Sequence, residues 1–264
     1  MLFDTHCHLN IIHNNKKDIN YIIKRALNNG VTSIFDISAG ASDFFIRKKL
    51  IMEVTNSYDC AIYLSAGIPP YFCDKRFPGD IEEVKKQAEG EKCVIGIGEI
   101  GLDYFHNYGK KSQQISLFIE QIEIANELGL PIVVHTRDAD TDLVETLKHD
   151  QPENSGIIHC YSSGVQTMKK LLDLGFYISF AGNVTYKKSV QIQDAARYVP
   201  EDRYLIETDS PYLSPEGCRG KPNEPANIVY TASHLAALRG VEFSLLAEQT
   251  SYNARKVLGV EERV

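Results

Sequence analysis

Short apolar segments alternate with longer amphipathic segments along the whole chain of 264 residues, and this alternation limits the possible folds most strongly. Neighbouring strands of a parallel sheet need a crossover connection, usually a helix, between them. Eight apolar segments have the length and composition of such strands, and they cover residues 2–8, 31–38, 61–67, 93–99, 131–136, 156–160, 176–181 and 204–208.

Apolar residues recur at helical spacing in the gaps between these strands. Eight strand–helix units in a chain of this length predict an α/β fold of the (β/α)8 TIM-barrel type, with residues 1–264 as a single domain. An open doubly wound sheet is the alternative, but no glycine-rich phosphate loop follows the first strand. The predicted helices cover residues 18–28, 43–54, 81–89, 113–128, 140–148, 165–174, 189–197, 226–238 and 244–258.

The composition narrows the classes of function. No apolar run has the length of a membrane helix, and the first residues lack the features of a signal peptide. Six cysteines without a CxxC pair favour a reducing compartment, so we expect a cytoplasmic protein without membrane contact or an obligate protein partner. A net charge of −7 argues against a broad basic face, although bound divalent ions would still allow a nucleic-acid substrate.

Six polar residues stand at or just after the carboxyl ends of predicted strands, which is the face of a barrel where active sites form. Burying so many polar groups together is costly unless a positive charge gathers them, so the pattern predicts a metal site. On the first strand, two histidines at positions i and i+2 point the same way and can bind one ion. The six candidate ligands are His6, His8, Glu99, His135, His159 and Asp209.

Six ligands exceed the three or four that one catalytic zinc ion takes from a protein. We therefore expect two divalent ions, with Glu99 as the bridging carboxylate. His6, His8 and Asp209 would complete one site, while His135 and His159 would complete the other. Mixed histidine and carboxylate ligands suit Zn, Mn or Co, and they do not exclude Mg. The remaining histidines are interpreted as ordinary core or surface residues, namely His13, His106, His149 and His234.

Several segments together resemble the TatD family of metal-dependent deoxyribonucleases, within the amidohydrolase-like barrels. The resemblance runs along nearly the whole chain in order. Its segments are DTHCHLN at 4–10, IGEIGLDY at 97–104, LPIVVHTRDA at 130–139, HCYSS at 159–163, YISFAGNVTY at 177–186, ETDSPYL at 207–213 and RGKPNEPAN at 219–227.

The resemblance implies a divalent-metal hydrolase that acts on ester bonds of DNA, typically as a 3′-5′ exonuclease. It implies the same six metal ligands, and it adds the substrate, with single-stranded DNA or 3′ ends as the expected partner. The sequence departs from the family in the loop after the third strand, where Pro69 takes the place of a usual histidine. Any contact that this histidine makes is therefore in doubt here.

The predicted catalytic residues are Asp209 and Glu99, with Asp209 as the general base that accepts a proton from a metal-activated water. Arg137 could clamp a phosphate oxygen or form an ion pair with a nearby aspartate. Arg219 and Lys221 are candidate phosphate contacts or solvated loop residues. Tyr104 and the aromatic residues near it could stack on unpaired bases or pack beneath a loop.

Two other functions remain open at this point. Related barrels use such a site to hydrolyse a non-phosphate bond, such as a cyclic amide or an ester, and a small closed apolar pocket would favour that function. A catalytically silent scaffold is the third possibility, although such a protein need not retain all six candidate ligands.

Overall fold

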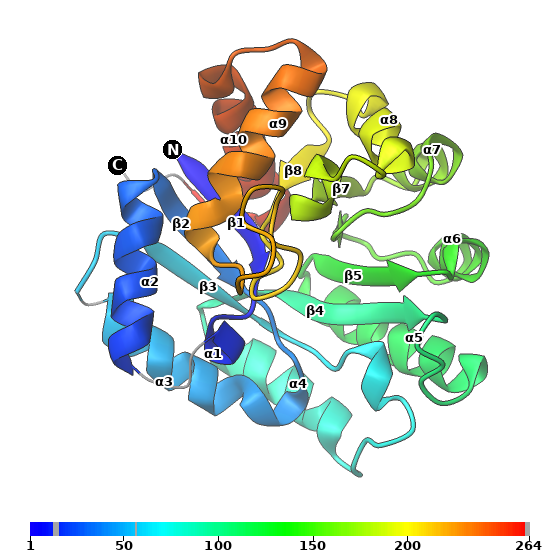
Figure 1. Cartoon of the computed structure of the whole chain (residues 1–264). Helices are drawn as coiled ribbons and strands as arrows, with labels where there is room; N and C mark the ends of the chain where they lie inside the picture. Colours follow the sequence, from blue (N-terminus) through cyan, green and yellow to red (C-terminus); the bar gives the residue numbers. More distant parts are fainter. Residues whose placement is uncertain (13–15, 56, 262–264) are drawn as a thin grey trace.

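The computed structural model describes residues 1–12, 16–55 and 57–261. Its eight strands form one parallel sheet in sequence order, and the helices surround the sheet (Figure 1). The predicted (β/α)8 barrel is confirmed. The strands are β1 Leu2–Cys7, β2 Val31–Asp36, β3 Ala61–Ala66, β4 Val94–Asp103, β5 Ile132–Arg137, β6 Ile157–Ile158, β7 Tyr177–Phe180 and β8 Tyr204–Ile206.

Backbone contacts between the first strand and the segment after the last strand close the barrel. Cys7 pairs with Ser210 in a parallel bridge. The Asp209 amide donates to the His6 carbonyl at 2.9 Å, and the His8 amide donates to the Ser210 carbonyl at 2.8 Å. The closure therefore uses the same short segments that carry three candidate ligands.

Except for the short α1, which was not predicted, the helices follow the predicted segments, and short additional turns lie in the loops. The α-helices are α1 Leu9–Ile12, α2 Lys16–Asn28, α3 Phe44–Thr55, α4 Asp80–Gly90, α5 Lys111–Leu128, α6 Asp140–His149, α7 Val165–Asp173, α8 Val190–Tyr198, α9 Ile228–Arg239 and α10 Phe243–Leu258. The 3-10 turns are η1 Ala41–Asp43, η2 Pro70–Phe72, η3 Gly182–Thr185 and η4 Pro225–Asn227. Within the described ranges, no helix is both long and apolar enough to cross a bilayer.

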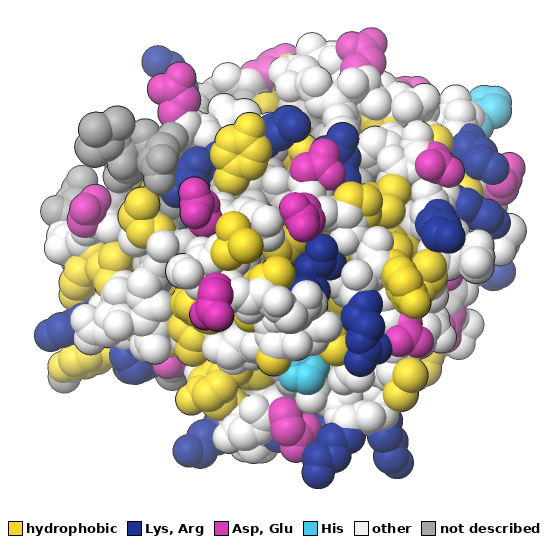
Figure 2. Space-filling view, turned by 90° about the horizontal axis from the view of Figure 1, so that it is seen from above, with side chains coloured by type: hydrophobic (Ala, Val, Ile, Leu, Met, Phe, Trp, Pro, Cys, Tyr) yellow, Lys and Arg dark blue, Asp and Glu magenta, His cyan; other side chains and the backbone are white. Residues whose placement is uncertain are grey.

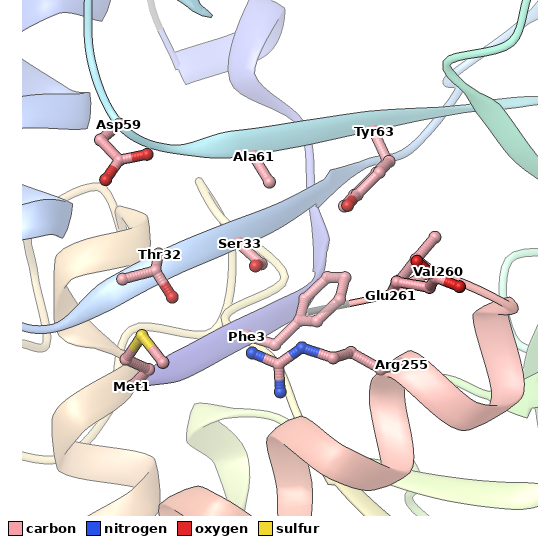
Figure 3. Close-up of a pocket in the computed structure, with 10 residues that line it drawn as sticks. All are labelled: Met1, Phe3, Thr32, Ser33, Asp59, Ala61, Tyr63, Arg255, Val260 and Glu261. Atoms are coloured by element: carbon pink, nitrogen blue, oxygen red, sulfur yellow. The ribbon is translucent and has the colours of Figure 1, made fainter. Parts of the chain in front are cut away.

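Two apolar layers hold the barrel together. The larger layer lies between the strands and the surrounding helices, where α2 buries one face through Ile19, Ile22 and Ile23. The smaller layer takes a side chain from every strand and adds Ala254 and Leu258 of α10. Because each strand contributes to it, this layer fills the inside of the barrel, and α10 covers its amino-terminal end. Figure 3 shows this end, with Phe3 of β1 facing Arg255 of α10.

The surface carries charges of both signs. Figure 2 shows acidic and basic side chains mixed over the face that it displays, with apolar side chains scattered between them. A mixed surface produces only a weak long-range field. Binding of a polyanion would therefore depend on local charge near the site rather than on the general surface.

Candidate metal centre

The structure brings all six candidate ligands together at the carboxyl end of the barrel. His6 lies in β1, and His8 directly follows that strand, while His135 lies in β5. His159 directly follows β6, and Asp209 lies in the loop after β8. Glu99 differs from the expectation, because it does not end its strand. β4 continues to Asp103 through pairing with β5, after an irregularity in the register between Ile97 and Ile100.

One group of donor atoms forms around the two histidines of β1. The Nε2 atoms of His6 and His8 lie 3.2 Å apart. Asp209 Oδ1 lies 3.7 Å from the first of these atoms and 3.8 Å from the second. Glu99 Oε2 lies 3.9 Å from each of them. Four donor atoms with this spacing surround a point that a single cation can occupy, and His6, His8 and Asp209 form one candidate metal cluster.

A second group forms around the other oxygen of the same glutamate. Glu99 Oε1 lies 2.7 Å from His135 Nδ1 and 3.1 Å from His159 Nε2. These two ring nitrogens lie 3.1 Å apart. The two oxygens of Glu99 thus face different donor groups, as a carboxylate that bridges two cations must do.

Further contacts fix the histidine rings from their far edges. His8 Nδ1 lies 3.0 Å from the Ile37 carbonyl oxygen, which can only accept, so this nitrogen carries the proton and Nε2 is left with its lone pair. His135 Nε2 lies 3.2 Å from Asp103 Oδ2. His159 Nδ1 lies 3.3 Å from Glu207 Oε1, an ion-pair distance without hydrogen-bond alignment. Such contacts hold the other nitrogen of each ring toward a metal.

Burial controls the charges in the centre. It raises the pKa of the Asp209 carboxyl well above its usual value, with partial opposition from His159. Burial alone would also raise the pKa of Glu99, but the His159 and His135 rings hold it well below its usual value. Burial lowers the pKa of His6 well below its usual value, which keeps this ring neutral. Neutral imidazole and ionised carboxylate are the forms that bind cations.

The donor set fits divalent metal ions. Glu207 Oε2 and His6 Nδ1 are buried without a hydrogen-bond partner. Glu207 is fully buried beside His159, in a region that already holds Glu99 and Asp209. Buried carboxylates and unpartnered nitrogens are costly without a compensating cation. Nitrogen and oxygen donors in this mixture suit Mn or Zn, and Mg is compatible with the carboxylates.

A cavity of about 860 Å³ opens above the centre. All the candidate ligands except His6 line it. Aromatic side chains and Arg137 also contribute to its walls. The Arg137 guanidinium packs 3.9 Å from the centroid of the Phe105 ring. This cavity differs from the small closed apolar pocket that would favour a non-phosphate substrate. It is large, and charged side chains line part of it.

The other predicted substrate contacts lie farther from the centre. The Arg219 guanidinium packs 4.4 Å from the Tyr186 ring centroid, and Lys221 is exposed. Neither side chain lines the cavity over the candidate ligands. Tyr104 lines a separate cavity of about 410 Å³ and donates a hydrogen bond to Asp142. These three residues do not meet the six candidate ligands, and their substrate contacts stay predictions.

Two acidic residues of the centre were missed in the sequence. Asp103 contacts His135. It was missed because β4 continues past Glu99 and ends at Asp103, which makes the strand longer than predicted. Glu207 contacts His159, and it lies two residues before Asp209. An extended chain places such residues on the same side, so the ETD segment carried a usable signal for Glu207. Asp103 carried the weaker signal of following a motif glutamate.

The histidines outside the six differ in their positions. His106 lines the cavity and contacts Asp103 through Nδ1 at 2.8 Å, which its interpretation as an ordinary residue did not anticipate. His149 is exposed at the end of α6, and His234 is partly buried in α9. His13 lies outside the described residues.

Comparisons with known proteins agree with the geometry. The model of the TatD related DNase family matches residues 3–259. The chain is 37% identical to the uncharacterized metal-dependent hydrolase YcfH of Escherichia coli (strain K12), over 98% of this chain and 96% of that protein. It is 30% identical to the 3′-5′ ssDNA/RNA exonuclease TatD of Erwinia billingiae, over 91% of this chain and 93% of that protein.

The fold agrees as well. The crystal structure of YJJV, a TatD homologue from Escherichia coli K12, has a TM-score of 0.90 against this chain at 26% identity, with 98% of each chain covered. The family match covers almost the whole barrel, including every candidate ligand. The chain therefore belongs to the TatD-related family of metal-dependent hydrolases.

Proposed function

We propose that this protein is a divalent-metal-dependent deoxyribonuclease that removes nucleotides from 3′ ends, with single-stranded DNA as its preferred substrate. The observation that carries the proposal is the position of Glu99, whose two oxygens face two separate groups of donors. Paired cations are suited to phosphodiester hydrolysis, where charge develops on both the entering and the leaving oxygen. Residues 1–264 would form one catalytic domain, and the absence of a disulfide among the described cysteines agrees with a cytoplasmic location.

The proposed ligands divide between two ions. His6, His8 and Asp209 would hold one ion, His135 and His159 would hold the other, and Glu99 would contact both. When bound, Mg, Mn or Zn ions would polarise the phosphodiester and lower the pKa of a water molecule. Asp103 and Glu207 would keep two of the histidine rings in the correct orientation.

Asp209 is the proposed general base. It lines the cavity and lies beside the His6 and His8 rings, so its carboxylate can accept a proton from a water molecule that attacks the phosphorus. A carboxyl whose pKa is raised by burial is a stronger base than one in free solution. Arg137 is the proposed contact for a phosphate oxygen, since its side chain lines the same cavity.

DNA as the substrate is supported by the size of the cavity and by the relatives. A volume of about 860 Å³ accommodates a nucleotide with part of its neighbour. The Erwinia billingiae relative is named for 3′-5′ exonuclease action on single-stranded DNA and RNA. The chain carries a net charge of −7, so it repels the phosphates of DNA. The bound ions would reduce this repulsion at the site.

The test uses purified protein with 5′-labelled single-stranded and double-stranded DNA, in the presence of Mg, Mn or Zn and with a chelator control. We expect a ladder of products shortened from the 3′ end, faster on single strands, and no cleavage with the chelator. Asp209→Asn should lower the rate by about 100- to 10,000-fold. Asp59→Asn, an exposed change at the opposite end of the barrel, is the matched control.

Metal content per chain is measured for every variant, so that loss of a base is separated from loss of an ion. Absence of DNA cleavage with any ion, together with chelator-sensitive hydrolysis of a cyclic amide or a carboxylic ester, would replace the proposal with the non-phosphate alternative. Wild-type turnover by Asp209→Asn at full metal content would remove Asp209 from the role of base.

A further inference from the structure

His106 is held firmly on the wall of the cavity although it is not a candidate ligand. Its Nδ1 lies 2.8 Å from Asp103 Oδ2, and its backbone amide donates to Asp103 Oδ1 at 3.0 Å. The ring stacks on Tyr108 with centroids 5.3 Å apart, and the Phe105 ring meets it edge to face at 4.9 Å. One carboxylate and two aromatic rings therefore fix the orientation of this imidazole.

The opposite nitrogen of the ring is available to a ligand. Nε2 of His106 has no hydrogen-bond partner among residues 1–12, 16–55 and 57–261, and 40% of the side chain is exposed. Because the carboxylate of Asp103 holds Nδ1, the Nε2 edge of the ring is left for a phosphate oxygen that enters the cavity. Arg137 packs over the Phe105 ring, so a cationic side chain lies along the same cavity wall as His106.

The position of His106 separates it from the bond that is cut. The His135 ring faces Glu99 with Nδ1 and Asp103 with Nε2, which are opposite edges of the ring. Asp103 and then His106 thus lie beyond His135 when viewed from the centre. A phosphate held between two ions at the centre would leave His106 to meet the next phosphate of the strand. At a 3′ end, that phosphate lies one nucleotide to the 5′ side.

We propose that His106, positioned by Asp103, binds the phosphate one nucleotide to the 5′ side of the scissile bond. The inference rests on the proposed exonuclease function and deepens it, because it makes a trinucleotide the shortest substrate that fills the site. A dinucleotide has only the scissile phosphate and cannot make this contact. His106 acts by holding the strand in register rather than by taking part in bond cleavage.

The first experiment compares kcat/KM for a thymidine trinucleotide, a thymidine dinucleotide and a trinucleotide with a neutral methylphosphonate at its 5′ linkage. The wild-type protein should prefer the normal trinucleotide over the other two by about tenfold or more, as expected for a hydrogen bond to a charged group. In His106→Asn and His106→Phe, this preference should fall to about twofold or less.

The two variants separate contact with the substrate from support of Asp103. An asparagine retains a short donor toward Asp103 but loses the nitrogen that faces the cavity, whereas a phenylalanine keeps only the ring stack. If His106→Asn retains the wild-type preference, or if all three substrates lose rate equally, the inference is overturned. His149→Asn is the matched control, since His149 also pairs with an aspartate but is 87% exposed outside the cavity.

A binding measurement does not depend on hydrolysis. Two 5′-labelled trinucleotides are compared by fluorescence anisotropy, one with a methylphosphonate at the 3′ linkage only and one with methylphosphonates at both linkages. The wild-type protein should bind the first about tenfold more tightly, and His106→Asn should bind the two equally. Absence of DNA cleavage would defeat the proposed function alone, while equal binding by the wild-type protein would defeat this inference alone.

Discussion

The two ends of the barrel use the same eight strands for opposite purposes. At the amino-terminal end, one apolar side chain from each strand fills the interior, and α10 covers the opening. The cavity that remains there is only about 70 Å³ (Figure 3). At the carboxyl end, histidines and carboxylates are buried beneath a cavity of about 860 Å³. A single strand such as β1 runs from Phe3 in the apolar interior layer to His6 at the polar end.

The difference shows how the fold tolerates a costly site. The polar end gathers carboxyls and imidazoles at distances that are unfavourable until cations arrive, so it contributes little to the stability of the metal-free protein. The apolar end has no such role and can be packed for stability alone. We therefore expect changes at the apolar end to affect folding, and changes at the polar end to affect metal binding and catalysis.

The largest expected effect on stability is at the apolar end. Phe35 is fully buried, and its ring lies against Gly96, where an added Cβ would stand only 3.2 Å from Phe35 Cζ. Phe35→Ala should lower the free energy of unfolding by about 3–5 kcal/mol, because the cavity cannot collapse inside a closed barrel. Urea unfolding measures this loss, and metal content per folded chain should stay at the wild-type value. A variant that unfolds normally but lacks metal would break the division between the two ends.

A smaller effect is expected at the polar end. Glu207→Gln removes the charge that faces His159 while keeping the shape of the side chain, so we expect metal affinity to fall by about 10- to 100-fold. Isothermal titration with Zn or Mn measures the change. Glu201→Gln is the matched control, since Glu201 is exposed before the same strand. Equal affinities for both variants would show that Glu207 does not support the metal centre.

The sequence was a good guide to the strands because each one is a short apolar segment buried on both sides. It was a weaker guide to their ends, which depend on pairing between strands. Residues 100–103 extend β4 because they pair with residues 134–137 of β5, and no side-chain pattern marks this extension. β6 is only Ile157–Ile158, although the apolar segment around it is longer.

The grouping of the candidate ligands was predictable because all of them except Glu99 stand near or just after the carboxyl end of a strand, and a barrel brings those ends together. The contacts around them depend on which way each side chain turns in a loop. Tyr104 and Tyr108 are four residues apart, yet Tyr104 turns toward α6 and Tyr108 stacks on His106 at the main cavity. Sequence spacing carries no information about such a choice, and the folded geometry was needed to find it.

A gradual, pH-dependent effect tests the boundary between the two ends, where Asp4 lies between Phe3 and His6. Asp4 is fully buried and accepts hydrogen bonds from the Thr208 amide and hydroxyl. Burial raises its pKa from 3.8 to about 7. The stabilising contribution of a carboxyl with a raised pKa is fully present below pH 3.8, and it is lost as the pH rises toward 7.

In metal-free protein, the free energy of unfolding of the wild type should therefore fall relative to Asp4→Asn by about 1 kcal/mol for each pH unit inside this window. Urea unfolding between about pH 4.5 and about pH 8 measures the difference, with Asp59→Asn as the exposed control. A difference that stays constant with pH would mean that Asp4 is ionised throughout this range. Its charge would then contribute to the polar end of the barrel. A difference that grows with pH would mean that the apolar layer extends to Asp4 and that the polar end of the barrel begins only at His6.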